Sequence, residues 1–136
     1  MKKEPRYRYL DAIDRALSGG ATVRVAVIVE RVELTSAFDG SETLRASLRE
    51  ELTARHEQAL LYEAGFSGRA GFRLVDADAI APLIGGEGGV EQTGGLSPQV
   101  RGRLAAEGGL THVLLVASRQ GNISSWGSNI AHAVKI

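Results

Sequence analysis

Apolar residues along this chain recur at helical spacing in some segments and at alternating positions in others. Near the N-terminus the helical spacing stops at Gly19-Gly20, which predicts a helix over about residues 6–18. The next run, TVRVAVIVERVEL, alternates valines with other apolar residues, so a strand there is apolar on both faces. Such a strand is usually central in a sheet and covered by helices on both sides.

The longest predicted helix covers about residues 41–64. Asp39 and Glu42, three residues apart, resemble a capping box at its start, and Gly65 closes it. Leu44, Leu48 and Leu52 form its apolar stripe, with Leu60 and Leu61 near its end. After a polar turn, GFRLVDA predicts a short second strand, so that strand, helix and strand form a βαβ unit.

The second half of the chain predicts two more helices and two more strands. A short helix is expected from Asp76 or Asp78 to residue 84, and a second one from Ser97-Pro98 to the glycine pair at 108–109, with Val100 and Leu104 as its buried stripe. Between them lies a glycine-dense stretch, 85–96, which we expect to be a flexible loop because ordering glycine costs much conformational entropy.

The runs THVLLVASRQ and SNIAHAVKI predict the last two strands. The second alternates, with Ile130, His132, Val134 and Ile136 on one face, and suits antiparallel pairing. The sequence therefore predicts one α/β domain over residues 1–136, with a three-layer arrangement. Its mixed sheet has about four strands, mostly parallel with the last one antiparallel, covered by helices.

The length, charge and cysteine content of the chain exclude several classes of function. The 136 residues suit one domain, and 16 basic against 16 acidic residues give no positive field for a nucleic-acid partner. The chain has no cysteine, which excludes disulfides, thiolate metal sites and a cysteine nucleophile. No apolar run approaches the roughly 20 residues of a transmembrane helix, and the start MKKEPRYRY lacks the apolar centre of a secretory signal.

No catalytic, cofactor-binding or metal-binding constellation is predicted. The glycine-rich loop has no lysine and so does not match a phosphate-binding P-loop. The three histidines are not at metal-ligand spacing. His112 and His132 could become neighbours if their strands pair, and we interpret them as histidines in or beside the core. Asp76 and Asp78 could bind a cation, but a helix N-terminus explains them more simply.

The loops at 85–96 and 120–128 are the predicted partner-binding surface, because loops commonly carry partner contacts. Trp126, the only tryptophan, lies in a polar turn, where it serves either as a contact anchor or as a cover for the sheet edge. The residues predicted to contact a partner are Glu87, Val90, Gln92, Asn122 and Trp126.

The order of segments in this chain resembles that of the curli-secretion lipoprotein family. The segments are VRVAVIVE, a long helix, GFRLVDADAI, a glycine-rich stretch, LAAEGGLTHVLLVASRQ and IAHAVKI. The family's relatives include the penicillin-binding-protein activator lipoproteins and the TolB N-terminal-like domains. The likeness covers about residues 22–136. It implies a three-layer α/β domain for assembly or protein contacts in the bacterial envelope, with no catalytic residues to carry over. The family's lipid-bearing cysteine and a final D-x-x-T-G strand are missing here, which under this resemblance implies a truncated domain.

We therefore expect a non-enzymatic interaction or assembly domain of a bacterial envelope accessory protein, with another protein as its partner and no cofactor. It would lie in the periplasm or envelope if a signal segment was removed, and otherwise in the cytoplasm. Two alternatives stay open. One is a cytoplasmic small-ligand sensor or enzyme, favoured if Asp39, Asp76 and the glycine-rich loop converge on one pocket. The other is a structural subunit, such as a homo-oligomer, whose last strand completes a neighbour's sheet.

Overall fold

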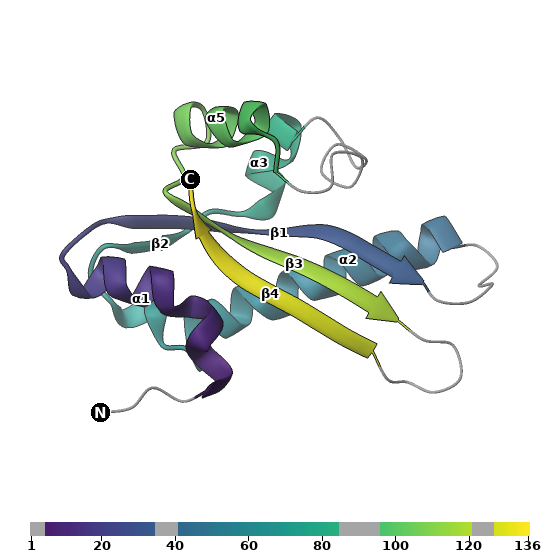
Figure 1. The fold of residues 1–136 in the computed structure, drawn as a ribbon, viewed down its shortest axis with the longest axis horizontal. Coiled ribbons are helices and arrows are strands. Elements are labelled where there is room, and N and C mark those ends of the chain that lie inside the picture. Colours follow the sequence, from purple (N-terminus) through teal and green to yellow (C-terminus); the bar gives the residue numbers. More distant parts are fainter. Residues whose placement is uncertain (1–4, 35–40, 85–95, 121–126) are drawn as a thin grey trace.

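The four predicted strands form one mixed sheet. A computed structural model describes residues 5–34, 41–84, 96–120 and 127–136. The strand order is β2-β1-β3-β4, as Figure 1 shows. The strands are β1 (Val23–Leu34), β2 (Phe72–Leu74), β3 (His112–Gln120) and β4 (Gly127–Lys135). β1 is parallel to both β2 and β3, whereas β4 is antiparallel to β3, so the predicted mixed α/β fold is confirmed.

The helices lie close to their predicted positions. They are α1 (Asp11–Ser18), α2 (Ser41–Gln58), α3 (Ala77–Ile84) and α5 (Pro98–Ala106), with shorter turns η1 (Pro5–Leu10), η2 (Ala59–Glu63) and η3 (Phe66–Gly68). Two predicted α-helices change type at one end, since η1 is a 3-10 turn and η2 a π turn. Gly65 follows η2 with φ of 75°, a left-handed conformation that glycine adopts without strain, so the chain turns there as expected.

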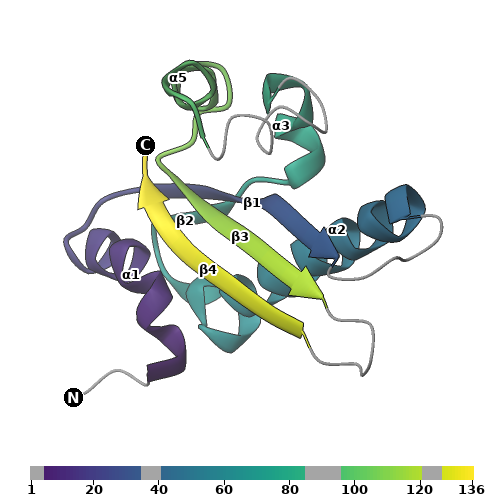
Figure 2. The same ribbon diagram turned by 45° about the vertical axis from the view of Figure 1, so that its right-hand side comes forward.

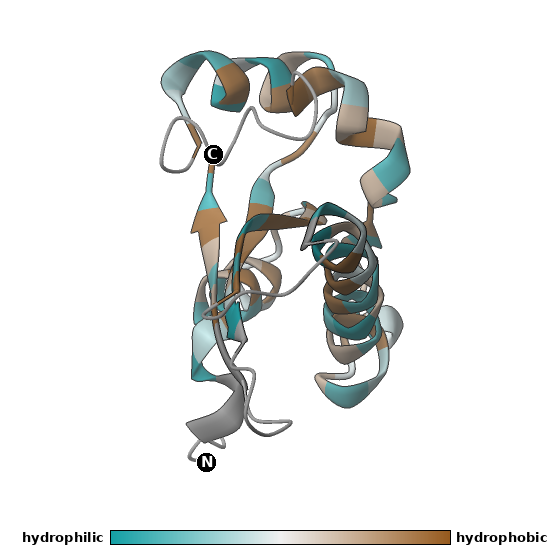
Figure 3. Cartoon of the chain, turned by 90° about the vertical axis from the view of Figure 1, so that its right-hand side faces the viewer, coloured by the Kyte–Doolittle hydropathy of each residue, from teal (hydrophilic) through white to brown (hydrophobic). Residues whose placement is uncertain are grey.

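Valines and leucines of β1 and β3 point alternately to two apolar layers, one on each face of the sheet. On the α1–α2 face, strand residues such as Val25, Val27 and Leu114 pack against Leu10 and Leu60. On the α3–α5 face, the packed residues are Ala26, Ile28, Val113, Leu115, Ile80, Val100 and Leu104. Figure 3 shows α3 and α5 on one side of the sheet and α2 on the other. The predicted three layers follow from this two-sided burial.

The α3–α5 face is covered only in part. In Figures 1 and 2, α3 and α5 lie over the end of the sheet where β3 begins and β4 ends. Val134 and Ile136 pack under these helices, but Ile130, which shares their face, is 69% exposed. His132 is exposed as well. The predicted antiparallel pairing of β4 is confirmed. Its α3–α5 face is covered only in part, because the two helices do not extend over the far end of the strand.

Candidate functional site

The loop residues predicted to contact a partner lie outside the described part of the chain. These residues are Glu87, Val90, Gln92, Asn122 and Trp126. The same holds for Asp39 and for residues 85–95 of the glycine-rich loop. The role assigned to them stays a prediction. Candidate sites are therefore sought among the helices and strands that the structure does describe.

The histidines do not form a common site. Register pairs Leu115 with His132 and Lys135 with His112, so the two histidines lie on opposite faces of the sheet and the idea that they could be neighbours is wrong. His112 is only 4% exposed, and its Nδ1 lies 2.8 Å from the Thr111 hydroxyl oxygen. Burial, with a smaller contribution from Lys135, lowers the pKa of His112 and favours the neutral ring. It is a satisfied core histidine, as expected.

Three carboxylates surround the start of α3. Asp76 accepts a hydrogen bond from the Asp78 backbone N–H at 2.9 Å, which confirms its interpretation as a helix cap. Glu57 of α2 is hydrogen-bonded to the Ala77 backbone and so ties α2 to α3. Burial raises the pKa of Glu57, and the neighbouring charges of Asp76 and Asp78 add to this increase, while the hydrogen bond opposes it. Across the described residues, no three acidic or histidine side chains are grouped to hold a metal.

Two hollows border this helix start. The larger, about 740 Å³, lies between α2 and α3 and is lined by Ala46, Arg49, Glu50, Thr53, Ala54, Glu57, Asp76, Ala77, Asp78 and Ala81. Several of its polar groups already serve the fold: Arg49 donates to the Val29 carbonyl oxygen, and the Thr53 hydroxyl donates to the Arg49 carbonyl oxygen at 2.8 Å. We therefore interpret it as a polar seam between two helices.

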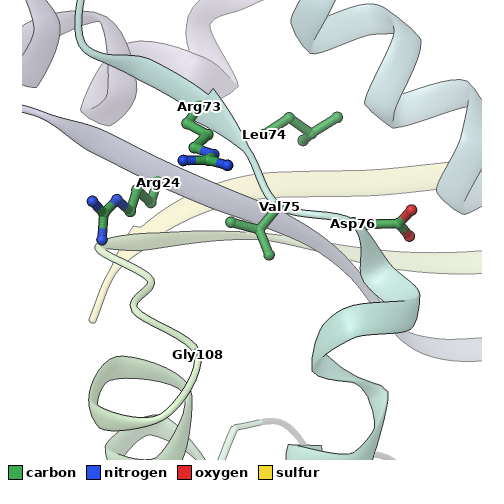
Figure 4. Close-up of a pocket in the computed structure, with 6 residues that line it drawn as sticks. All are labelled: Arg24, Arg73, Leu74, Val75, Asp76 and Gly108. Carbon is green, nitrogen blue, oxygen red and sulfur yellow. The ribbon is translucent and has the colours of Figure 1, made fainter.

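The smaller hollow, about 340 Å³, lies where β1 and β2 begin and is lined by Arg24, Arg73, Leu74, Val75, Asp76 and Gly108. Arg24 and Arg73 are paired residues on adjacent parallel strands. Figure 4 shows both side chains at the same end of the hollow, with the Asp76 carboxylate at the other end and directed away from them. Sequence reasoning missed this pair, although VRV and FRL both place an arginine second in a predicted parallel strand.

The two edges of the sheet differ in how they are protected. Beyond Val25, β1 has no described strand on the side of β2, which spans only three residues. Two arginines of α2 close this edge: Arg45 Nε donates to the Val32 carbonyl oxygen at 3.1 Å, and Arg49 donates to that of Val29. These two carbonyl oxygens are therefore already hydrogen-bonded and less available to pair with another strand.

Strand β4 forms the opposite edge, and there Arg101 of α5 donates a hydrogen bond to the Lys135 carbonyl oxygen at 3.0 Å, at the C-terminal end of the strand. The strand pairs with β3 through nine consecutive residues without a register shift. Its sequence, GSNIAHAVK, contains no proline and one charged residue, Lys135, at its end. Natural edge strands usually carry charges, prolines or bulges that prevent pairing with another chain. Every second residue of β4 turns its N–H and C=O groups away from β3, as in any antiparallel ladder.

None of the described helices is both long and apolar enough to cross a membrane. Comparisons of the chain with protein-family models, curated proteins and solved structures give no match. The resemblance to envelope lipoproteins accordingly stays a prediction. The features that the structure adds to the sequence are the long, regular β4 edge and the paired arginines of the smaller hollow.

Proposed function

We propose that this chain is a protein-interaction and assembly domain that binds through the edge of β4. The observation that carries the proposal is the contrast between the two sheet edges. Side chains of α2 occupy carbonyls along the β1 edge, whereas β4 is a long, regular and almost uncharged edge on which Arg101 contacts the carbonyl at the end of the strand, that of Lys135. Adding a strand to such an edge supplies main-chain hydrogen bonds without any further change in the domain.

The surface beside this edge supports the same proposal. Ile130 lies on the α3–α5 face beyond the cover of the helices and is 69% exposed. Single exposed apolar residues are ordinary, but this one lies on the edge strand itself, where it would contact the side chains of an added strand. Burial of Ile130 would then add about 1.5–3 kcal/mol to the backbone pairing.

The occupant that fits best is β4 of a second copy of this chain. Antiparallel pairing centred on His132 places Ile130 opposite Val134 of the second copy and Ala131 opposite Ala133. Apolar residues then face apolar residues on both faces of the extended sheet. The formal net charge is zero, with 16 basic and 16 acidic residues, so two copies do not repel each other through their overall charge.

Sedimentation equilibrium of the full chain tests this proposal. We expect reversible dimers in the wild type and dimer dissociation at least roughly tenfold weaker in Ile130→Lys, a loss of about 1.4 kcal/mol. Tyr62→Lys is the matched control, because Tyr62 is 72% exposed and lies in η2 rather than on the edge strand. A wild type that stays monomeric into the millimolar range, or a Tyr62→Lys variant that dissociates as readily as Ile130→Lys, would overturn it.

Only the resemblance to envelope lipoproteins indicates where in the cell this protein acts and in which process. If the chain is related to the envelope lipoproteins, the strand addition proposed here would serve assembly in the periplasm or at the envelope. The proposal of strand pairing does not depend on that relation, because the register and composition of β4 support it separately.

A further inference from the structure

We propose that the hollow beside Arg24 and Arg73 binds a phosphate group. The two arginines are in direct register on β1 and β2, and both line the hollow. Both arginines are exposed, so water screens part of their repulsion. Like charges on directly paired strand residues still destabilise a sheet, and an anion bound between them would relieve this. A phosphate group suits this position, because it carries about two negative charges at neutral pH and accepts hydrogen bonds from two guanidinium groups.

Arg24 and Arg73 differ from the arginines that pair with acidic side chains. Five of the described arginines form ion pairs with carboxylates; these are Arg31, Arg45, Arg55, Arg69 and Arg119. Within the described ranges, no carboxylate forms such a pair with Arg24 or Arg73. Asp76 is the one acidic residue that lines the hollow, and it already accepts the Asp78 N–H at the start of α3. Two cations thus share a hollow in which no described carboxylate forms an ion pair with either of them.

The end of α5 shapes the wall of this hollow. Gly109 has φ of +68°, and a Cβ atom there would lie 3.5 Å from Arg24 Nη1. At Gly108 a Cβ atom would lie 2.7 Å from the Leu104 carbonyl oxygen, so a larger residue would displace the turn. The helix C-terminus carries partial negative charge and accounts for a cation such as Arg24. It does not account for Arg73, whose nearest paired neighbour is the other arginine.

The size and position of the hollow define what it can hold. About 340 Å³ lies at the lower end of the range of small-molecule sites, enough for a phosphate group with a small substituent. The hollow lies at the α5 side of the sheet near the start of β1, whereas the free edge proposed for strand pairing is β4. Phosphate binding and strand pairing are therefore separate inferences, and either can fail without the other.

Amide chemical shifts of the full chain, followed by NMR, test the phosphate site. Inorganic phosphate and methyl phosphate are titrated separately at constant ionic strength, with chloride as the balancing anion. We expect saturable shifts at Arg73, Gly108 and Thr111, and an affinity at least roughly tenfold lower in Arg73→Gln, since a charge-assisted contact is lost. Arg55→Gln is the control, because Arg55 pairs with Glu51 on the exposed side of α2 and lies outside both hollows.

Arg73→Glu separates loss of binding from loss of folding. The new carboxylate gives Arg24 an opposite charge in direct register, so the melting temperature should not decrease while the phosphate response disappears. Binding of both anions shows a site for a phosphate group on a small molecule, and binding of inorganic phosphate alone shows a site for the free ion. Unsaturable shifts, or equal affinities in the wild type and Arg73→Gln, would overturn the proposal.

Discussion

Replacing Arg45 with Met removes one of the two side chains that close the β1 edge. Met has nearly the same helix propensity as Arg and keeps an unbranched apolar stem, so α2 itself should be unaffected. The lost contact is the hydrogen bond from Arg45 Nε to the Val32 carbonyl oxygen, at 3.1 Å. The variant also loses the ion pair with Glu42, at 2.9 Å.

The expected loss of stability depends on how exposed the Arg45 and Glu42 side chains are. A charge-assisted hydrogen bond is worth about 1.5–3 kcal/mol when buried, and the Arg45 side chain is 30% exposed, so we reduce this to about 1 kcal/mol. Glu42 is 84% exposed, and its pair with Arg45 adds no more than about 0.5 kcal/mol. We therefore expect Arg45→Met to lower the free energy of unfolding by about 1–1.5 kcal/mol, which corresponds to a melting temperature lower by roughly 3–6 °C.

Urea unfolding followed by circular dichroism measures this difference. Arg55→Met is the matched control on the same helix, because it removes the pair with Glu51, whose side chains are 57% and 60% exposed. That control should cost less than about 0.5 kcal/mol. Equal losses in the two variants would refute the reasoning, since they would show that contact with the strand carbonyl contributes nothing beyond an exposed ion pair.

Two further predictions concern pH and the contact between α2 and α3. The lowered pKa of His112 means that the unfolded chain takes up a proton at this histidine before the folded chain does. The free energy of unfolding should therefore decrease as pH falls below about 6.5, and His112→Gln should flatten this dependence. A pH dependence that is unchanged in His112→Gln would contradict this. The raised pKa of Glu57 means that its contribution to stability is present below about pH 4.5 and is lost as pH rises above that value. Glu57→Gln keeps an acceptor for the Ala77 backbone, so at pH 7 it should be at least as stable as the wild type. Glu57→Ala should lose about 0.5–2 kcal/mol in urea unfolding, and equal losses in both variants would argue against a stabilising hydrogen bond from Glu57 to the start of α3.

The element order could be predicted because each element carries its own local signal. Ser97 before Pro98 predicts a helix start, and in the structure its hydroxyl accepts a hydrogen bond from the Val100 N–H at 3.2 Å. The two-faced apolar run of β1 likewise predicts a central strand with helices on both sides, and both layers are present. These signals depend on spacing within a few residues.

The candidate sites could not be predicted in the same way, because they depend on register between distant segments. Arg24 and Arg73 are far apart in the sequence, and a shift of one residue would place them on opposite faces. Exposure of Ile130 depends on how far α3 and α5 reach over the sheet, which β4 itself does not encode. Closure of the β1 edge depends on which face of α2 meets the strand carbonyls.

A single cysteine at position 132 tests strand pairing through β4 most directly, since the natural sequence has no cysteine to confuse the result. In antiparallel pairing centred on His132, the two copies of this residue lie roughly 4.5–5.5 Å apart between Cα atoms, which suits a disulfide. The two copies of residue 130 would lie about 13 Å apart, too far for one. Under mild oxidation we predict that His132→Cys forms covalent dimers and that Ile130→Cys stays monomeric. Failure of His132→Cys to cross-link, or equal cross-linking of the two variants, would contradict the account.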